Sequence, residues 1–298
     1  LIAPFLWSLL NHVDKYVITK YAKEGGLGGL IVFSTLFSAV SLPFIFFIDK
    51  GIFSPTNLEI FYLIITGMIF ATATLFSLYA LTEEDASYIV PFWQLAPIFG
   101  FILGLIFLGE TISEHKILAS LLVIFGATIL SFEFEENVKF KLRPVLLMVF
   151  SSFFIALSDI IFKSHASEVG FWPSIFWNQV GMALFGLICL LLIKNYRKDF
   201  VKILKANGNE PRFLTLNIFT EVALIIANIV NYYAMLLAPV SLVLLVNYTT
   251  QPLFVFAEGI LLTLYFPHIL TEKLSKKHLW QKFISIIIMG VGIYFIYQ

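Results

Sequence analysis

Long apolar runs alternate with short polar connections along the whole chain. A helix that crosses a bilayer needs about 20 mostly apolar residues. Runs of this kind predict ten membrane-spanning helices, at roughly 1–22, 28–48, 58–80, 86–108, 117–133, 142–165, 171–193, 213–235, 240–266 and 279–298. A transmembrane β-barrel would instead need alternating segments of about ten residues. Continuous apolar runs such as 95–108 argue against that alternative.

The composition indicates the same class of protein. Apolar residues make up 59% of the 298 residues, charged residues 13%, and the mean hydropathy is +0.92. Soluble domains average about 45–50% apolar and about 25% charged residues. These values exclude a soluble enzyme, a disordered chain and a nucleic-acid binder, and the single cysteine, Cys189, excludes an internal disulfide. We expect an all-α polytopic membrane protein without a soluble domain.

The two halves of the chain resemble each other weakly. Residue types recur at an offset of 143 (151 minus 8), which rises to 155 (252 minus 97) after the longer connection 194–212 and then to 162 (272 minus 110). The matched positions are Ser8 with Ser151, Lys20 with Lys163, Phe33 with Phe176, Pro97 with Pro252, and 110–113 with 272–275. Each half has five spans, and this odd number makes the second half enter the membrane from the opposite side. We predict two inverted five-helix repeats, 1–138 and 139–298, in one integral membrane domain, as is common in secondary transporters.

Short motifs recur at matching places in the two halves. They are Leu108-Gly109-Glu110 with Thr111-Ile112-Ser113, Gly126, Tyr79-Ala80-Leu81 and Pro97 in the first half, and Tyr233-Ala234-Met235, Pro252 and Gly290 in the second. With these motifs the whole chain resembles the ten-helix EamA-type branch of the drug/metabolite transporter superfamily. The second half departs from it, since Leu264-Tyr265-Phe266 stands where Leu-Gly-Glu is expected. The resemblance implies a central cavity lined by spans 1, 3, 4, 6, 8 and 9, with spans 5 and 10 at the periphery; it names no substrate.

Polar residues concentrate in the spans expected to line that cavity. An ionisable group near the bilayer centre costs at least about 2.5–3.5 kcal/mol and by default faces the bundle interior. One helical face of span 8 carries Asn217, Glu221, Asn228 and Asn231, and one face of span 9 carries Asn247, Gln251 and Glu258, with Tyr248 beside them. The alternative for the amides is hydrogen bonding that only holds helices together. For Glu221 and Glu258 the alternative is a structural ion pair.

Spans 1 and 6 carry charges of both signs. Span 1 holds Asn11, His12, Asp14 and Lys15, and span 6 holds Asp159 and Lys163. Asp159 and Lys163 are four residues apart, so one alternative is a local salt bridge. Another is that Lys163 extends to the membrane surface. His12 has no second histidine or cysteine at ligand spacing, so we expect no metal site and no cofactor.

Spans 4 and 9 each contain a proline, Pro97 and Pro252. Proline removes a backbone hydrogen bond and kinks a helix, and matching interruptions in two halves indicate a hinge or a binding site. An ordinary kink is the alternative. Trp93 and Gln94 lie one turn before Pro97, where they form either a cavity wall or, for Trp93, an interfacial anchor.

Together these features predict a secondary active transporter for a small polar or zwitterionic, amino-acid-like metabolite. It would work by alternating access and be proton-coupled or an exchanger, with Glu221 and Glu258 as proton carriers and Pro97 and Pro252 as hinges. The predicted substrate-binding residues are Asn11, His12, Asp14, Lys15, Trp93, Gln94, Asp159, Lys163, Asn228, Asn231, Asn247, Tyr248 and Gln251. The rivals are a flippase for a lipid-linked sugar or phosphate, a non-transporting scaffold and a membrane enzyme, for which no catalytic motif is present.

The expected partners are a small-molecule solute and the lipid bilayer, with no nucleic acid; a homodimer would use spans 5 and 10. We expect a multi-pass protein of a prokaryotic inner (plasma) membrane. Of the 19 Lys and Arg residues, all but Lys50, Lys116 and Lys163 lie in or beside the odd-numbered connections. The positive-inside rule places those connections in the cytoplasm and both termini outside.

Overall fold

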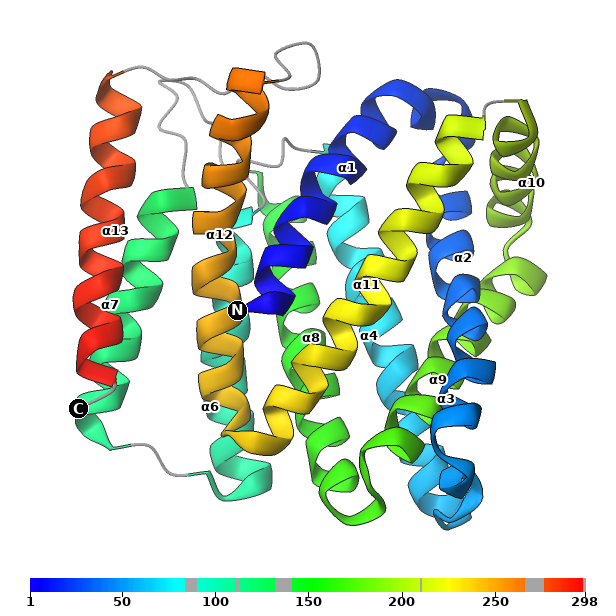
Figure 1. The fold of residues 1–298 in the computed structure, drawn as a ribbon, viewed down its shortest axis with the longest axis horizontal. Coiled ribbons are helices and arrows are strands. Elements are labelled where there is room, and N and C mark those ends of the chain that lie inside the picture. Colours follow the sequence, from blue (N-terminus) through cyan, green and yellow to red (C-terminus); the bar gives the residue numbers. More distant parts are fainter. Residues whose placement is uncertain (84–89, 111–112, 132–140, 210, 266–275, 297–298) are drawn as a thin grey trace.

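The structure, a computed structural model, describes residues 1–298 except 84–89, 111–112, 132–140, 210, 266–275 and 297–298. Side chains at several helix ends, including those of 14–25, also lie outside the description. The described part is helical (Figure 1). Its α-helices are α1 Ile2–Gly25, α2 Leu27–Phe37, α3 Ser41–Ile48, α4 Asn57–Glu83, α6 Leu95–Leu108, α7 Glu114–Ser131, α8 Leu142–Val169, α9 Phe171–Leu192, α10 Lys194–Asn209, α11 Pro211–Leu237, α12 Val240–Tyr265 and α13 Lys276–Ile296.

Within the described residues, six helical segments are long and apolar enough to cross a membrane. They are Leu27–Ile48, Asn57–Ala80, Leu142–Val169, Phe171–Leu192, Thr215–Leu237 and Val240–Tyr265, and shorter apolar segments occupy Ile2–Val13, Phe92–Leu108 and Trp280–Phe295. The chain is therefore a multi-pass integral membrane protein.

Local sequence signals explain several helix ends. The Thr56 backbone N–H donates to Glu59, and the Glu59 N–H faces the Thr56 hydroxyl, which is a capping box at the start of α4. Gly109 ends α6 in a left-handed conformation, φ +63°, which glycine adopts without strain. This turn brings Glu110 directly after α6.

The described part of the fourth predicted span begins with a 3₁₀ turn. This turn, η3 Val90–Gln94, runs directly into α6, and Pro97 lies in the first turn of α6. A first-turn proline gives up a backbone N–H that would have no partner inside the helix. The expectation that Pro97 interrupts a helix interior is therefore wrong, whereas Pro252 does lie inside α12.

Helices from the two halves interleave (Figure 1). α8 packs along α4 and α6, and α1 packs along α11 and α12. α7 and α13 pack together at one edge, where the resemblance places spans 5 and 10. Their hydroxyls at Ser120, Thr128 and Ser285 each donate to the carbonyl four residues earlier in the same helix. The polar groups available for other contacts are thus concentrated in the interior helices.

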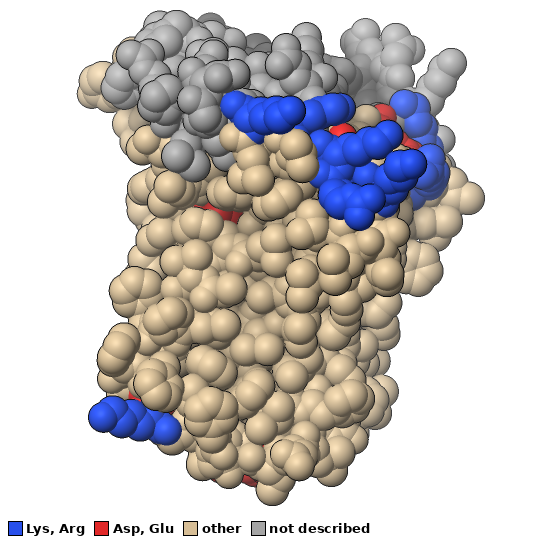
Figure 2. All heavy atoms as spheres, turned by 90° about the vertical axis from the view of Figure 1, so that its right-hand side faces the viewer, with Lys and Arg blue, Asp and Glu red and all other residues tan. Residues whose placement is uncertain are grey.

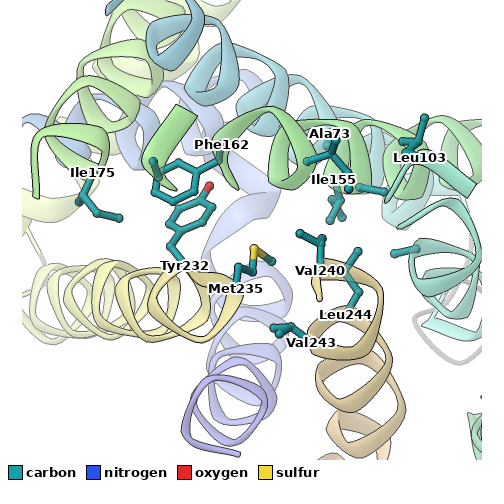
Figure 3. Packing of buried hydrophobic residues seen from close by; sticks show 14 of the residues in the cluster. Ala73, Leu103, Ile155, Phe162, Ile175, Tyr232, Met235, Val240, Val243 and Leu244 are labelled. Atoms are coloured by element: carbon teal, nitrogen blue, oxygen red, sulfur yellow. The ribbon is translucent and has the colours of Figure 1, made fainter. Parts of the chain in front are cut away.

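The main apolar core lies where α8 meets α11 and α12 (Figure 3). Phe162 stacks on Tyr232 with ring centroids 4.0 Å apart, and Met235 and Leu244 are fully buried beside them. Lipid tails are as apolar as these side chains, so close van der Waals packing has to hold such helices together. The core therefore depends on shape complementarity.

Glycines allow the closest helix approach, between α4 and α9. A Cβ atom at Gly67 would overlap the backbone carbonyl oxygen of Asn178, and one at Gly181 would overlap that of Ile64. Backbone cannot move aside as a flexible side chain can. The α4–α9 interface therefore requires glycine at both positions.

Replacing Gly67 by Ala should destabilise the protein by about 1–3 kcal/mol, because the methyl group overpacks this interface. The thermal unfolding midpoint in detergent should fall accordingly. Gly290→Ala is the matched control, since no atom lies within 4 Å of a Cβ built there. A midpoint that is equal in the two variants would contradict the close-contact interpretation.

α10 corrects the prediction that 194–212 is only a connection. Its inner face is tied to the bundle: the Tyr196 hydroxyl hydrogen-bonds the Tyr79 hydroxyl, and Ile203 is buried. Burial, reinforced by Tyr79, raises the pKa of Tyr196. The other face exposes five basic residues, which Figure 2 shows gathered near one end of the molecule: Lys194, Arg197, Lys198, Lys202 and Lys205.

Candidate functional site

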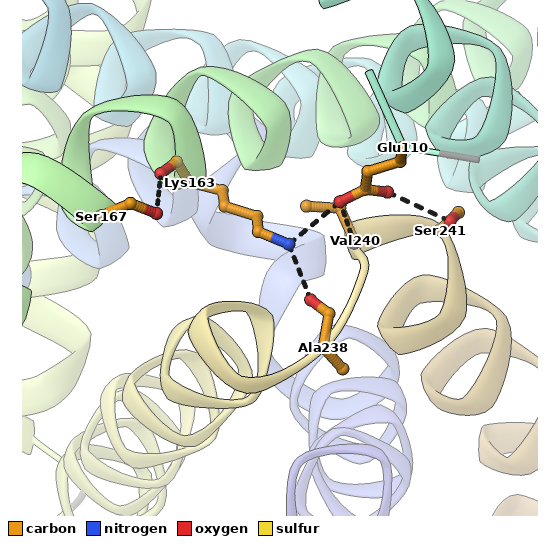
Figure 4. A network of polar contacts seen from close by, with 6 residues as sticks. All are labelled: Glu110, Lys163, Ser167, Ala238, Val240 and Ser241. Atoms are coloured by element: carbon orange, nitrogen blue, oxygen red, sulfur yellow. Dashed lines mark hydrogen bonds and ion pairs between the residues drawn. The ribbon is translucent and has the colours of Figure 1, made fainter. Parts of the chain in front are cut away.

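A charged network joins the two halves near the α11–α12 turn (Figure 4). The Lys163 ammonium donates to Glu110 Oε1 at 2.9 Å and to the Ala238 carbonyl oxygen at 2.8 Å. Glu110 Oε1 also accepts from the Val240 backbone N–H at 2.9 Å, and its Oε2 from the Ser241 hydroxyl at 3.2 Å. The two charged side chains are 18% and 10% exposed.

This network satisfies two helix ends at once. Glu110 accepts from the first residues of α12, where unpaired N–H groups favour a negative charge, and Lys163 donates to the turn after α11, where carbonyls favour a positive one. Because Glu110 follows α6 and Lys163 belongs to α8, four segments meet here. The network therefore ties these four segments together at this end of the bundle.

The geometry identifies the partner of Lys163. The local salt bridge with Asp159 is wrong, because Lys163 pairs with Glu110 instead. Extension to the membrane surface stays a prediction, and the ammonium also donates to the Ala238 carbonyl oxygen in the α11–α12 turn. Spacing along the sequence could indicate only charged partners on the same helix. The packing of α8 against the end of α6 brings the Glu110 carboxylate to Lys163 instead.

Asp159 is buried inside the bundle and forms no ion pair with Lys163. It is 2% exposed, and within the described part of the chain it makes no hydrogen bond and no ion pair. One turn further along α8, Phe162 stacks on Tyr232 of α11. The Tyr232 hydroxyl is itself buried.

A second carboxylate lies between α1 and α12. Glu258 Oε1 accepts from the Ser8 hydroxyl at 2.8 Å, and its Oε2 lies 3.8 Å from His12 Nε2. The same His12 nitrogen is 3.0 Å from the Val255 carbonyl oxygen. This trio places a carboxylate beside an imidazole in the interior, which suits proton exchange. Glu221, the other predicted proton carrier, accepts from the Ser34 hydroxyl at 2.9 Å.

The amide groups of α11 and α12 turn inward. The Asn247 amide donates to Asn231 Oδ1 at 2.6 Å, so this pair does link the two helices, as the alternative predicted. Asn228 and Gln251 are also buried, and their side chains make no hydrogen bond among the described residues.

The residues before α6 contribute mainly structure. The Gln94 amide donates to the Tyr248 carbonyl oxygen at 2.7 Å, which ties η3 to α12. Trp93 is partly buried against the main core, and its role as an interfacial anchor stays a prediction. Pro97 borders an apolar pocket between α6, α7 and α12. Pro252 is buried.

The predicted site residues are thus only partly brought together. Asn11 is half-buried on α1, and the side chains of Asp14 and Lys15 lie outside the described residues. Sequence reasoning placed Glu110 in a family motif but missed it as a charged partner. Its position after a helix-ending glycine was a usable signal, because it puts a carboxylate at a helix boundary inside an apolar chain.

Comparison with known proteins agrees with this architecture. Residues 1–132 match the sequence model of the EamA-like transporter family, part of the drug/metabolite transporter superfamily, which confirms the resemblance over the first half. No curated protein matches the chain. A solved structure described only as "Crystal structure of protein" is similar over 99% of this chain and 93% of its own, with a TM-score of 0.65 and 14% sequence identity. At that identity the likeness shows a shared fold alone.

Proposed function

Because residues 1–132 belong to the EamA-like transporter family, we propose that the whole chain is a secondary active transporter. It moves a small polar or zwitterionic metabolite through the bundle interior by alternating access, as a proton-coupled carrier or an exchanger, and not as an enzyme. The observation that carries this proposal is the Glu110–Lys163 network. It joins both halves at one end of an interior that holds Asp159, Asn228 and Gln251.

Two inverted five-helix repeats form the working architecture. The pairing of helices supports it: α4 and α6 pack on α8, and the corresponding α11 and α12 pack on α1. In this scheme α1 and α8 are equivalent first helices of the two halves. Rocking of one repeat against the other would break the Glu110–Lys163 network and open that end.

The charge distribution supports an orientation. The five exposed basic residues of α10 lie at the opposite end of the bundle from the α11–α12 turn (Figures 1 and 2). By the positive-inside rule we place the α10 end in the cytoplasm. The network then closes the outer side, in a prokaryotic plasma membrane.

The test is thermal stability of the purified protein against four ligand classes at pH 5.5 and 7.5. The panel holds amino acids, sugar phosphates, quaternary amines and polyprenyl phosphates. A ligand that binds the folded state raises the unfolding midpoint by mass action, so we expect a pH-dependent rise with one soluble class. A rise only with polyprenyl phosphates would replace the carrier by a flippase, and no rise with any class would favour a scaffold.

A further inference from the structure

Most charges inside the described bundle have a partner of opposite charge or a hydrogen-bond donor. Lys163 pairs with Glu110, Glu258 contacts Ser8 and His12, and Glu221 accepts from Ser34. Asp159 differs, because at 2% exposure it has neither within the described residues. A buried ionised carboxylate is stable only when it is paired or protonated. Its counter-charge must therefore come from a proton or from a ligand.

Asp159 lies on the side of α8 that meets α11 and α12. It lies one turn from Ile155 and from Phe162, both of which pack into the core against α11 and α12. Lys163, four residues after Asp159, donates to the Ala238 carbonyl oxygen in the turn between α11 and α12. Asp159 is therefore on the face of α8 that packs against α11 and α12.

Aromatic rings belong to the core cluster on this side of α8. Phe162 stacks on Tyr232, and Tyr248 stacks on Trp7 with centroids 6.1 Å apart. Aromatic faces attract cations, more strongly where water is excluded. A carboxylate together with aromatic rings and the buried Tyr232 hydroxyl is suited to a protonated amine, whose N–H groups need acceptors.

We propose that Asp159 binds the ammonium group of the transported solute, between the rings of Tyr232 and Tyr248. The inference rests on the proposed transport function and narrows its substrates to amines, that is, to cations and zwitterions. The ammonium donates to the Asp159 carboxylate and to the Tyr232 hydroxyl oxygen. An anion without an amine finds no unpaired cation among the described interior side chains, since Lys163 is held by Glu110.

Three probes that share a side chain test the charge requirement. Phenylalanine and phenylalaninamide carry the ammonium group, and N-acetylphenylalanine does not. We expect the first two to bind the purified protein and the third not to bind, as measured by calorimetry and by the unfolding midpoint. Asp159→Asn should weaken binding of both amines by at least about tenfold, because hydrogen bonds to charged groups are the strong ones. Glu114→Gln, which changes an exposed carboxylate at the start of α7, should leave binding unchanged.

A second variant keeps the test decisive if Asp159→Asn does not fold. Tyr232→Phe retains the ring that stacks on Phe162 and removes only the buried hydroxyl. It should fold normally and weaken amine binding about threefold to tenfold. Undiminished binding of phenylalaninamide to either folded variant, or equal binding of N-acetylphenylalanine, would overturn the ammonium site.

Failure of the site and failure of the transport function are distinguishable. In proteoliposomes, uptake of a solute that lacks an amine, unaffected by Asp159→Asn, would overturn the ammonium site and leave the transporter intact. Amine binding that depends on Asp159 without uptake of any probe would support the site and contradict transport. If none of the three probes binds, the ammonium site is rejected.

Discussion

Glu258→Gln should abolish pH-driven uptake of the solute. Glutamine matches the shape of glutamate and can still accept from Ser8, but it cannot bind or release a proton. In the wild type one carboxylate oxygen is held by Ser8, and the other lies 3.8 Å from His12 without a hydrogen-bond partner among the described residues. That leaves a site where a proton can be gained and lost. The measurement is uptake into proteoliposomes with an imposed pH gradient.

Two comparisons test whether the loss of pH-driven uptake is specific to the Glu258 carboxylate. Glu83→Gln removes a carboxylate that pairs with Arg143, a residue whose side chain is 77% exposed, and it should leave uptake unchanged. Among the described residues, the titratable group that lies beside Glu258 is His12 on α1. It stays the same in both variants. If Glu258→Gln retains pH-driven uptake, its proton role is wrong, and Glu221→Gln becomes the variant to measure.

Glu110→Gln should lower the free energy of unfolding by about 3 kcal/mol. Removing the charge of one partner of a buried pair leaves the other charge uncompensated, and Lys163 would keep only neutral acceptors, the amide oxygen of the replacement glutamine and the Ala238 carbonyl oxygen. For a chain of this size the unfolding midpoint should fall by roughly 6–12 °C. The double variant Glu110→Gln with Lys163→Met should regain most of this loss, because no charge is then left buried.

An exposed pair provides the control for this experiment. Arg143→Met breaks the contact with Glu83 at a helix end, and we expect a change of less than about 1 kcal/mol. The double variant also tests the closed end. A cysteine placed at Ala238, with Cys189 replaced by serine, should react faster with a thiol reagent once the network is removed. An unchanged rate would show that the network stabilises the fold without closing the path.

Periodicity and hydropathy were enough to predict much of this molecule. The apolar runs correspond closely to helices, as in 142–165 against Leu142–Val169 and 240–266 against Val240–Tyr265. Membrane helices satisfy their backbone hydrogen bonds within each segment, so length and apolar content alone identify them. The match of residues 1–132 to a transporter family likewise follows from the chain itself. The high local charge of 194–212 hid α10, although the buried Tyr196 and Ile203, seven residues apart, mark one helical face.

Partner choice was decided only by the packing of helices. Lys163 had Asp159 four residues away, yet its partner is Glu110, 53 residues earlier, and Ser8 bonds to Glu258 across 250 residues. Side-chain spacing along one helix reports which residues share a face, whereas the partner depends on how close another backbone comes. That approach is set by contacts such as Gly67 against Asn178, which no local pattern contains. The unpartnered carboxylate of Asp159 emerged in the same way, because packing directed Lys163 to Glu110.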